Sequence, residues 1–152
     1  MTKERFKVIP AVFIIMEREY KIFLMLRKNT GYMDGMYGLP SGHVEAGESL
    51  THAIIREARE EAGVTLDQKR LKLCHVMYQA KHDETGERAN FFFTAEVWGG
   101  EPENCEPQKC GGVGWFPIDS LPPNIIPYIK TALAHIRNNV FLSELGWDES
   151  AS

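Results

Sequence analysis

The stretch that decides the fold is residues 42–64, GHVEAGESLTHAIIREAREEAGV. Ser49 can serve as the N-cap of a helix, because its hydroxyl can accept a hydrogen bond from an exposed N–H of the first turn. Gly63 suits the end of that helix, since glycine tolerates the left-handed conformation common there. Between them, apolar residues at helical spacing predict an amphipathic helix from about residue 50 to residue 62. The apolar stripe consists of Leu50, Ala53, Ile54 and Ala58.

Three glutamates, Glu57, Glu60 and Glu61, fall within about one turn of this predicted helix. Glu61 lies inside the apolar stripe, Glu57 at its edge, and Glu60 further round. Most charge runs are solvated faces, but a solvated face would point away from the stripe, and two of these three do not. Burying an uncompensated carboxylate is costly, so a cation or a base must lie nearby. A divalent metal such as Mg²⁺ favours oxygen ligands and phosphate-bearing substrates. Helix geometry alone therefore leaves two interpretations of the glutamates open, a metal site and a solvated acidic face.

The same stretch resembles the Nudix box, written G-x5-E-x7-R-E-U-x-E-E-x-G-U with U apolar. The residues match at the family spacing without a gap, although Ala58 puts a small side chain where a bulkier one is commoner. The matching residues are Gly42, Glu48, Arg56, Glu57, Glu60, Glu61, Gly63 and Val64.

This resemblance implies an α/β architecture, the Nudix fold, in which a mixed β-sheet is sandwiched between α-helices and the box forms a loop–helix–loop. The alternation of strands and helices along the chain agrees with that arrangement. The resemblance also implies hydrolysis of a nucleoside diphosphate linked to another group. Water would attack a phosphorus atom of the pyrophosphate, with Mg²⁺ as the cofactor and Mn²⁺ as a substitute.

Carried over to this sequence, the box makes Glu57 and Glu61 the expected principal metal ligands. Glu60 is expected to be a further ligand or to act through a bound water, and Glu57 is also a candidate general base. The backbone carbonyl of Ser41, which precedes the first box glycine, is expected to reach the metal as well. Some family members recruit another acid from a distant loop. Glu106 is the best candidate here, with a solvated loop glutamate as the alternative.

The remaining box residues, Glu48 and Arg56, are expected to form an ion pair that braces the box, so their mutation should damage geometry as well as chemistry. Arg27 and Lys28 end a predicted strand just before the loop on the substrate side. They could meet phosphate, or they could be a solvated pair.

Aromatic residues offer candidate contacts for the base. Phe91, Phe92 and Phe93 alternate across a predicted strand, so one ring set, represented here by Phe92, could face a base, with core packing as the alternative. Three further side chains in or beside the loop at residues 29–41 could touch the substrate. These are Tyr32, Tyr37 and His43.

Glycine, proline and β-branched residues divide the rest of the chain. Residues 29–41 and 99–112 are expected to be loops, and the second is long enough to be functional. A second helix is expected over residues 127–139. The tail at residues 141–147 is partly apolar, and its packing cannot be predicted from the sequence. Strands are expected over residues 6–16, 21–28, 71–80, 88–98 and 113–118.

Length and composition limit the class of protein. The 152 residues are expected to form one domain, 1–152, with a sizeable core. The net charge of −4 argues against nonspecific binding of nucleic acid or a membrane. With no signal peptide and no apolar run long enough to span a bilayer, we expect a cytoplasmic monomer or homodimer that binds a small nucleotide. The three cysteines are too sparse for a disulfide framework and are expected to be free.

The segments around the box narrow the substrate. NTGYMDGMYGLPSGHVEAGES (29–49) and EPENCEPQKCGGVGWFPIDSLPP (101–123) resemble MutT-like nucleoside triphosphate diphosphatases. Those enzymes release pyrophosphate from unmodified or oxidised (d)NTPs, which makes a (d)NTP the leading candidate. ADP-ribose pyrophosphatases typically carry a proline about fifteen residues beyond the box, which YQAKHDE (78–84) lacks. ADP-ribose therefore stays as an alternative, as do nucleotide sugars, dinucleoside polyphosphates and capped RNA ends, although the acidic balance disfavours long RNA.

Two other classes of function compete with hydrolysis. Noncatalytic binding modules of this fold commonly lose box glutamates. Isopentenyl diphosphate isomerases share the fold, but their box departs from the consensus and they use a catalytic cysteine. The intact box of this chain favours hydrolysis over both.

Overall fold

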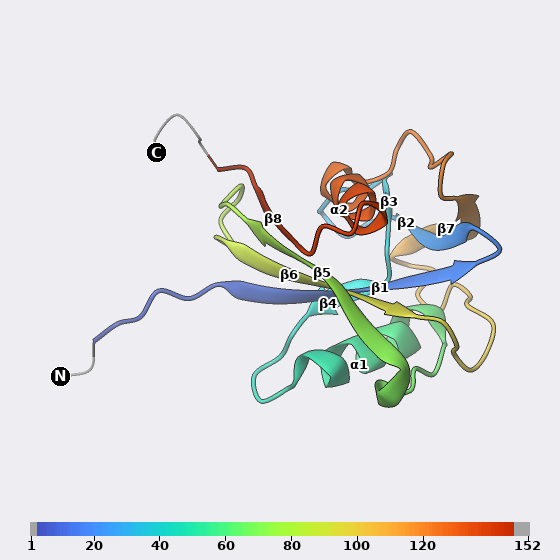
Figure 1. Ribbon diagram of the computed structural model, residues 1–152, viewed down its shortest axis with the longest axis horizontal. Coiled ribbons are helices and arrows are strands. Elements are labelled where there is room, and N and C mark those ends of the chain that lie inside the picture. The colour runs from blue at the N-terminus through green and yellow to red at the C-terminus, as the bar shows by residue number, and fades with distance from the viewer. Residues whose placement is uncertain (1–2, 148–152) are drawn as a thin grey trace.

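A mixed β-sheet forms the centre of the structure, and one helix packs against each of its faces (Figure 1). The predicted fold class is therefore confirmed. The computed structural model describes residues 3–147. The helices are α1 (Leu50–Ala62), α2 (Pro127–Arg137) and the short 3₁₀ helix η1 (Gln68–Arg70). The strands are β1 (Ile9–Arg18), β2 (Lys21–Arg27), β3 (Tyr37–Gly38), β4 (Ser41–His43), β5 (Leu71–Gln79), β6 (Arg88–Ala95), β7 (Cys110–Pro117) and β8 (Leu142–Leu145).

Strand β1 is the branching point of the sheet, whose main order is β3-β2-β1-β6-β5-β8. On one edge, β6 runs parallel to β1 from Ile9 to Met16. The other edge is shared, because β4 pairs with residues 11–13 of β1 and β2 pairs with residues 17–18. Strands β2 and β4 therefore diverge from the same edge of β1, and they stand on either side of a fork.

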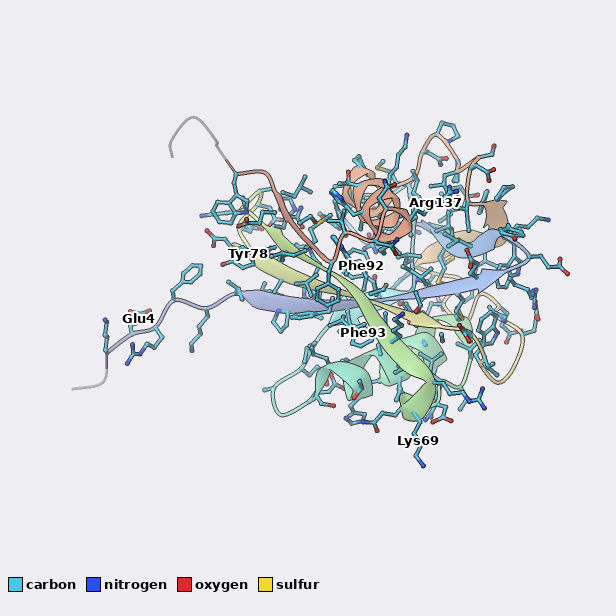
Figure 2. The ribbon with its side chains drawn as sticks, in the orientation of Figure 1. Glu4, Lys69, Tyr78, Phe92, Phe93 and Arg137 are labelled. Atoms are coloured by element: carbon cyan, nitrogen blue, oxygen red, sulfur yellow. The ribbon has the colours of Figure 1, made fainter. Side chains whose placement is uncertain are left out.

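Side chains of the central strands alternate between two cores, as the period of a strand requires. Phe92 belongs to the core that contains α2, whereas its neighbour Phe93 belongs to the core that contains α1 (Figure 2). Strand β1 shows the same alternation. Its residues Ala11, Phe13 and Ile15 pack in the α2 core, and Val12, Ile14 and Met16 pack in the α1 core.

Helix α1 has the predicted bounds and the predicted caps. The Ser49 hydroxyl accepts a hydrogen bond from the His52 N–H at 3.1 Å. Gly63 has φ 70°, the left-handed region that favours glycine, and its N–H is hydrogen-bonded to the last carbonyls of the helix. The apolar stripe is buried against the sheet, which fixes the rotation of the helix and therefore the direction of its glutamates.

The other elements differ from the predictions mainly at their ends. Strand β1 begins at Ile9 and reaches Arg18, and α2 ends at Arg137. The predicted loop at residues 29–41 contains the short strand β3 and the start of β4. Strand β7 begins at Cys110, inside the predicted loop, because its first residues pair with the end of β2. A local sequence pattern does not reveal such pairing with a distant strand.

The C-terminal segment contains a strand that the sequence did not predict. Strand β8 runs parallel to β5 at the edge of the sheet. The buried ring of His75 ties the two strands together, since Nδ1 is hydrogen-bonded to the Val140 carbonyl at 2.8 Å and Nε2 to the Ser143 hydroxyl at 2.7 Å. No helix within residues 3–147 is long and apolar enough to cross a membrane.

Candidate active site

A cleft of about 760 Å³ opens at the fork of the sheet. Its walls come from β1, β2, β4 and α1, together with the loop before β7 and the turn between β5 and β6. All three glutamates of the predicted metal site line it. The other predicted site residues that line it are Ser41, Arg56, Glu106, Arg27, Tyr32 and His43.

The three box glutamates differ in their exposure to solvent. The Glu57 side chain is 15% exposed and that of Glu60 is 53% exposed. Glu61 reaches furthest inward, and its Oε1 accepts a hydrogen bond from the Ser41 N–H at 2.7 Å. Glu61 and Glu57 thus face the cleft from the buried side of the helix, as their place on the apolar stripe predicted, and Glu60 lies towards solvent.

Burial makes these carboxylates unusual acids. The pKa of Glu61 is raised to about 8, mainly by desolvation and also by the negative charges of Glu57 and Glu106, against the opposing effect of the Ser41 N–H. Burial also raises the pKa of Glu57, opposed by the hydrogen bond from Arg56. The site therefore holds more negative charge than its own cations neutralise.

Gly42 allows helix α1 to approach β4 closely. A Cβ atom at this position would lie 2.2 Å from the carboxyl carbon of Glu57, a distance that no real contact reaches. The first glycine of the box is therefore required by the space that the Glu57 carboxylate occupies. Its backbone conformation does not require glycine, because its φ is not positive.

Arg56 and Glu48 form the predicted ion pair. The guanidinium donates from Nε to Glu48 Oε2 at 2.7 Å and from Nη2 to Oε1 at 2.9 Å, a two-pronged contact. These bonds, with one from the Glu45 N–H, hold the pKa of Glu48 at about 2. The same guanidinium donates from Nη1 to Glu57 Oε1 at 2.7 Å. Arg56 thus connects the loop before α1 to a candidate metal ligand.

Glu106 comes from the loop before β7 and meets the box across the cleft. The loop is fixed to the end of α1, because the Cys105 N–H donates to the Glu61 carbonyl at 3.1 Å. The Asn104 side chain then accepts from the Glu106 N–H at 3.1 Å and donates to the Cys110 carbonyl at 2.9 Å. The charge of Glu106 is close enough to raise the pKa of both Glu57 and Glu61.

The donor set fits a divalent cation that prefers oxygen ligands. Within residues 3–147 no three carboxylate, imidazole or thiolate groups already form a closed metal cage. Mg²⁺ does not need one, since it is usually bound by one or two carboxylates, several waters and substrate phosphates. Two half-buried carboxylates with raised pKa values, facing a polar cleft, match that mode of binding.

Two predicted substrate contacts need correction. Phe92 is 0% exposed and stacks on Phe13 in the α2 core, with ring centroids 4.5 Å apart, so it does not reach the cleft. Tyr37 packs edge to face on Phe116 and also lies outside the cleft lining. Lys28, the neighbour of Arg27, likewise lies outside it.

Other residues of the cleft were missed by sequence reasoning. Arg88 begins β6, and Asp83 and Thr85 belong to the turn before it. Tyr128 comes from α2 and Lys109 from the loop before β7. No spacing motif connects these positions, because the fold assembles them from separate parts of the chain.

Comparison with known proteins identifies the family. The family model described as the NUDIX domain matches residues 7–136. An ADP-ribose pyrophosphatase from Methanocaldococcus jannaschii is 34% identical over 139 residues, which cover 90% of this chain and 79% of that protein. An NAD-capped RNA hydrolase NudC from Pectobacterium carotovorum is 29% identical over 79% of this chain, and the match spans 44% of that longer protein.

A solved structure gives the same result. The crystal structure of a MutT NUDIX hydrolase from Burkholderia pseudomallei superposes with a TM-score of 0.77 at 28% identity, and the match covers 85% of this chain and 98% of that one. The chain belongs to the Nudix family of pyrophosphohydrolases, as its box predicted. Members of this family act on small nucleotide substrates and generally use a divalent metal.

Proposed function

We propose that this chain uses Mg²⁺ to hydrolyse the pyrophosphate bond of a (d)NTP, releasing the monophosphate and pyrophosphate. The observation that carries the proposal is the meeting of Glu57 and Glu61 with Glu106 in one cleft, beside Arg27 and Lys109. Such a site combines excess carboxylate with basic side chains. It suits a metal-bound polyphosphate, whose negative charge the metal and the basic side chains share.

Glu57 and Glu61 would hold the metal, with Glu60, Glu106 and the Ser41 carbonyl as further oxygen donors. When bound, the cation would neutralise phosphate oxygens and lower the pKa of the attacking water. Mn²⁺ has the same preference for oxygen ligands and should substitute.

The protein side chains would supply positioning. Arg56 donates to Glu57 Oε1, which opposes the rise that burial causes in the pKa of that carboxyl and leaves its other oxygen, Oε2, outside this contact. Oε2 is then the atom that would take the proton from water if Glu57 is the general base. Arg27 is held by its own bond from Nε to the Tyr32 carbonyl at 2.7 Å and would contact a phosphate.

ADP-ribose is the second candidate substrate. It is favoured by the relative named ADP-ribose pyrophosphatase, which matches 90% of this chain. The same carboxylates would cleave either compound, because both contain a pyrophosphate bond. The difference lies in what occupies the rest of the cleft.

The reaction would take place in the cytosol. All three cysteines, Cys74, Cys105 and Cys110, are free thiols, which supports a reducing compartment. A monomer or a homodimer stays a prediction.

A hydrolysis panel with identified products tests the proposal. It contains (d)NTPs and their oxidised forms, ADP-ribose, nucleotide sugars and diadenosine polyphosphates, each with and without Mg²⁺. A monophosphate plus pyrophosphate from one triphosphate is the expected result. Preferential cleavage of ADP-ribose would overturn the substrate but keep the mechanism. Folded protein that binds nucleotide and cleaves nothing would support a binding module. Glu61→Gln is the matched control, because hydrolysis that depends on the site should be lost in this variant.

A further inference from the structure

The end of the cleft away from the glutamates is built from two loops that touch each other. Tyr32, in the segment between β2 and β3, is hydrogen-bonded through its hydroxyl to His82 Nε2 at 3.3 Å. The Tyr32 ring also lies against two guanidinium groups, with Arg27 at 5.6 Å and Arg88 at 5.2 Å from its centre. These contacts fix the turn between β5 and β6 over the cleft.

Backbone pairing and ring contacts give the order of groups along the cleft. Arg27 pairs with Cys110, which follows the loop that carries Glu106. The Tyr32 ring contacts Arg27 and also Arg88, at the distances given above. The order is therefore the Glu106 loop, Arg27, Tyr32 and then Arg88.

Arg88 is a cation held almost out of water. The residue is only 7% exposed. Its Nη2 donates to Thr85 Oγ1 at 3.0 Å and to Asp83 Oδ2 at 3.3 Å, and its Nε donates to Thr85 Oγ1. Nη1 has no such partner among the described residues, and no buried nitrogen among them lacks one. Nη1 is therefore accessible, and because Arg88 lines the cleft, Nη1 is the atom of this residue that is available to a ligand.

The carboxylate beside Arg88 is already used by the turn. Asp83 Oδ1 accepts from both the N–H and the hydroxyl of Thr85. Oδ2 accepts from Arg88 and lies 3.4 Å from His82 Nε2. Asp83 is thus occupied within the turn, although Glu84 of the same turn also lines the cleft. The Arg88 guanidinium can only donate, so Arg88 itself selects a ligand group that is an acceptor.

We infer that Arg88 is a specificity-determining residue that hydrogen-bonds a carbonyl oxygen of the substrate's base. This inference rests on the proposed function, because a nucleotide with its phosphates at the glutamates would extend its base past Arg27 and Tyr32 toward Arg88. Guanine, uracil and thymine carry a carbonyl on the edge where adenine and cytosine carry an amino group. A donor such as Arg88 Nη1 can hydrogen-bond the carbonyl. Opposite the amino group it would face another donor, and neither group would have an acceptor.

Equilibrium binding of nucleoside monophosphates tests the inference without any need for hydrolysis. GMP and UMP are compared with AMP and CMP by calorimetry in the presence of Mg²⁺. We expect GMP and UMP to bind roughly tenfold more tightly, which is the discrimination that a good arginine contact to a base provides. The ratio of kcat/KM for GTP over ATP should show the same preference.

Two variants separate the role of Arg88 from a general effect of charge. Arg88→Lys keeps the charge but removes the planar fork, and it should reduce the preference to near unity. Arg18→Lys is the matched control, because Arg18 lies outside the cleft lining, is exposed and pairs with Glu101. The control should keep the full preference. Melting temperatures show whether each variant is folded.

Several outcomes would overturn the inference. They are equal affinity of the wild-type protein for all four monophosphates, and an unchanged preference in folded Arg88→Lys. Equal weakening of all four by Arg88→Lys would assign Arg88 to phosphate, which also contradicts base reading. If the variant does not fold, the wild-type comparison alone decides. Carbonyl preference in binding without turnover of any nucleotide would uphold the inference and contradict the proposed function.

Discussion

The Ser41 N–H donates to Glu61 Oε1 at 2.7 Å, so the first residue of β4 holds the innermost carboxylate of α1. This bond spans the Gly42 position, where the helix lies too close to the strand for any side chain. It leaves the other oxygen of Glu61 for a ligand. The backbone of the sheet therefore sets the position of the Glu61 carboxylate. The rotation of helix α1 sets how far that carboxylate is exposed to the cleft.

Glu61→Gln should abolish most turnover and leave the fold intact. Glutamine keeps an oxygen that can accept from Ser41, but it lacks the negative charge that would hold Mg²⁺. We expect kcat to fall by about a hundredfold or more, as when other strong electrostatic groups are removed from active sites. The measurement is a steady-state assay beside a thermal melt. Near-wild-type activity would contradict the metal assignment.

The metal-free protein should lose stability as pH rises. The pKa of Glu61 in the folded state is about 8, above the ordinary value of 4.5. Its contribution is thus fully present below pH 4.5 and is lost as pH rises through 8, because the folded state holds the proton more tightly. Melting temperatures between pH 5 and about 9 in a chelator would show this decline. Glu61→Gln should flatten the profile, and Mg²⁺ should restore stability at high pH.

Glu48→Gln should weaken catalysis through geometry. The change removes the charge that fixes Arg56 by two hydrogen bonds, and Arg56 in turn fixes Glu57. We expect roughly a tenfold loss of kcat, similar to the loss of other groups that orient metal ligands. A double-mutant cycle with Arg56→Lys is the measurement. Additive losses in the cycle would show that the two residues act independently.

Glu106→Gln tests whether the distal loop supplies an acid to the site. Glu106 faces Glu57 and Glu61, so its neutralisation should lower Mg²⁺ affinity by roughly tenfold. Asn104→Ala should reproduce part of this effect, because Asn104 accepts from the Glu106 N–H. Mg²⁺ titration of the rate gives both values. An unchanged rate for Glu106→Gln would show that Glu106 is a solvated loop glutamate. Glu103→Gln is the matched control on the same loop.

Gly42→Ala should damage the site more than the core. The new methyl group would overlap the Glu57 carboxylate, which must then rotate away from Arg56. We expect kcat to fall by about tenfold or more, because a displacement near 1 Å in a reacting group has effects of that size or larger. The assay is paired with Gly47→Ala, which meets no atom within 4 Å but has φ 79°. That control carries backbone strain without a clash at the site.

Local features of the sequence predicted helix α1 well. Its N-cap at Ser49, its end at Gly63 and its apolar stripe all lie within the helix itself, and they also placed Glu61 on the buried side. The ion pair between Glu48 and Arg56 followed from the family resemblance, because both residues belong to the box.

Features that depend on distant parts of the chain were not predicted. Strand β8 forms only against β5, so its residues show no signal in isolation. Arg88 reaches the cleft because β6 begins beside β1, a pairing that no local pattern reveals. Phe92 was a candidate contact for the base with core packing as the alternative, because strand alternation alone does not say whether a ring faces the core or the cleft, and the structure places it in the core.

The fork at β1 has a consequence for how such a protein can change. Strands β1 and β2 and helix α1 belong to the two cores, whereas residues 80–87 contribute no side chain to either core. That turn nevertheless supplies Asp83 and Thr85, which hold the Arg88 guanidinium in the wall of the cleft. Grafting a different turn at this point should redirect substrate choice while leaving the hydrolytic helix and the melting temperature nearly untouched. In this scaffold the catalytic groups and the groups that select the substrate lie on separate parts of the chain, so one part can change without the other.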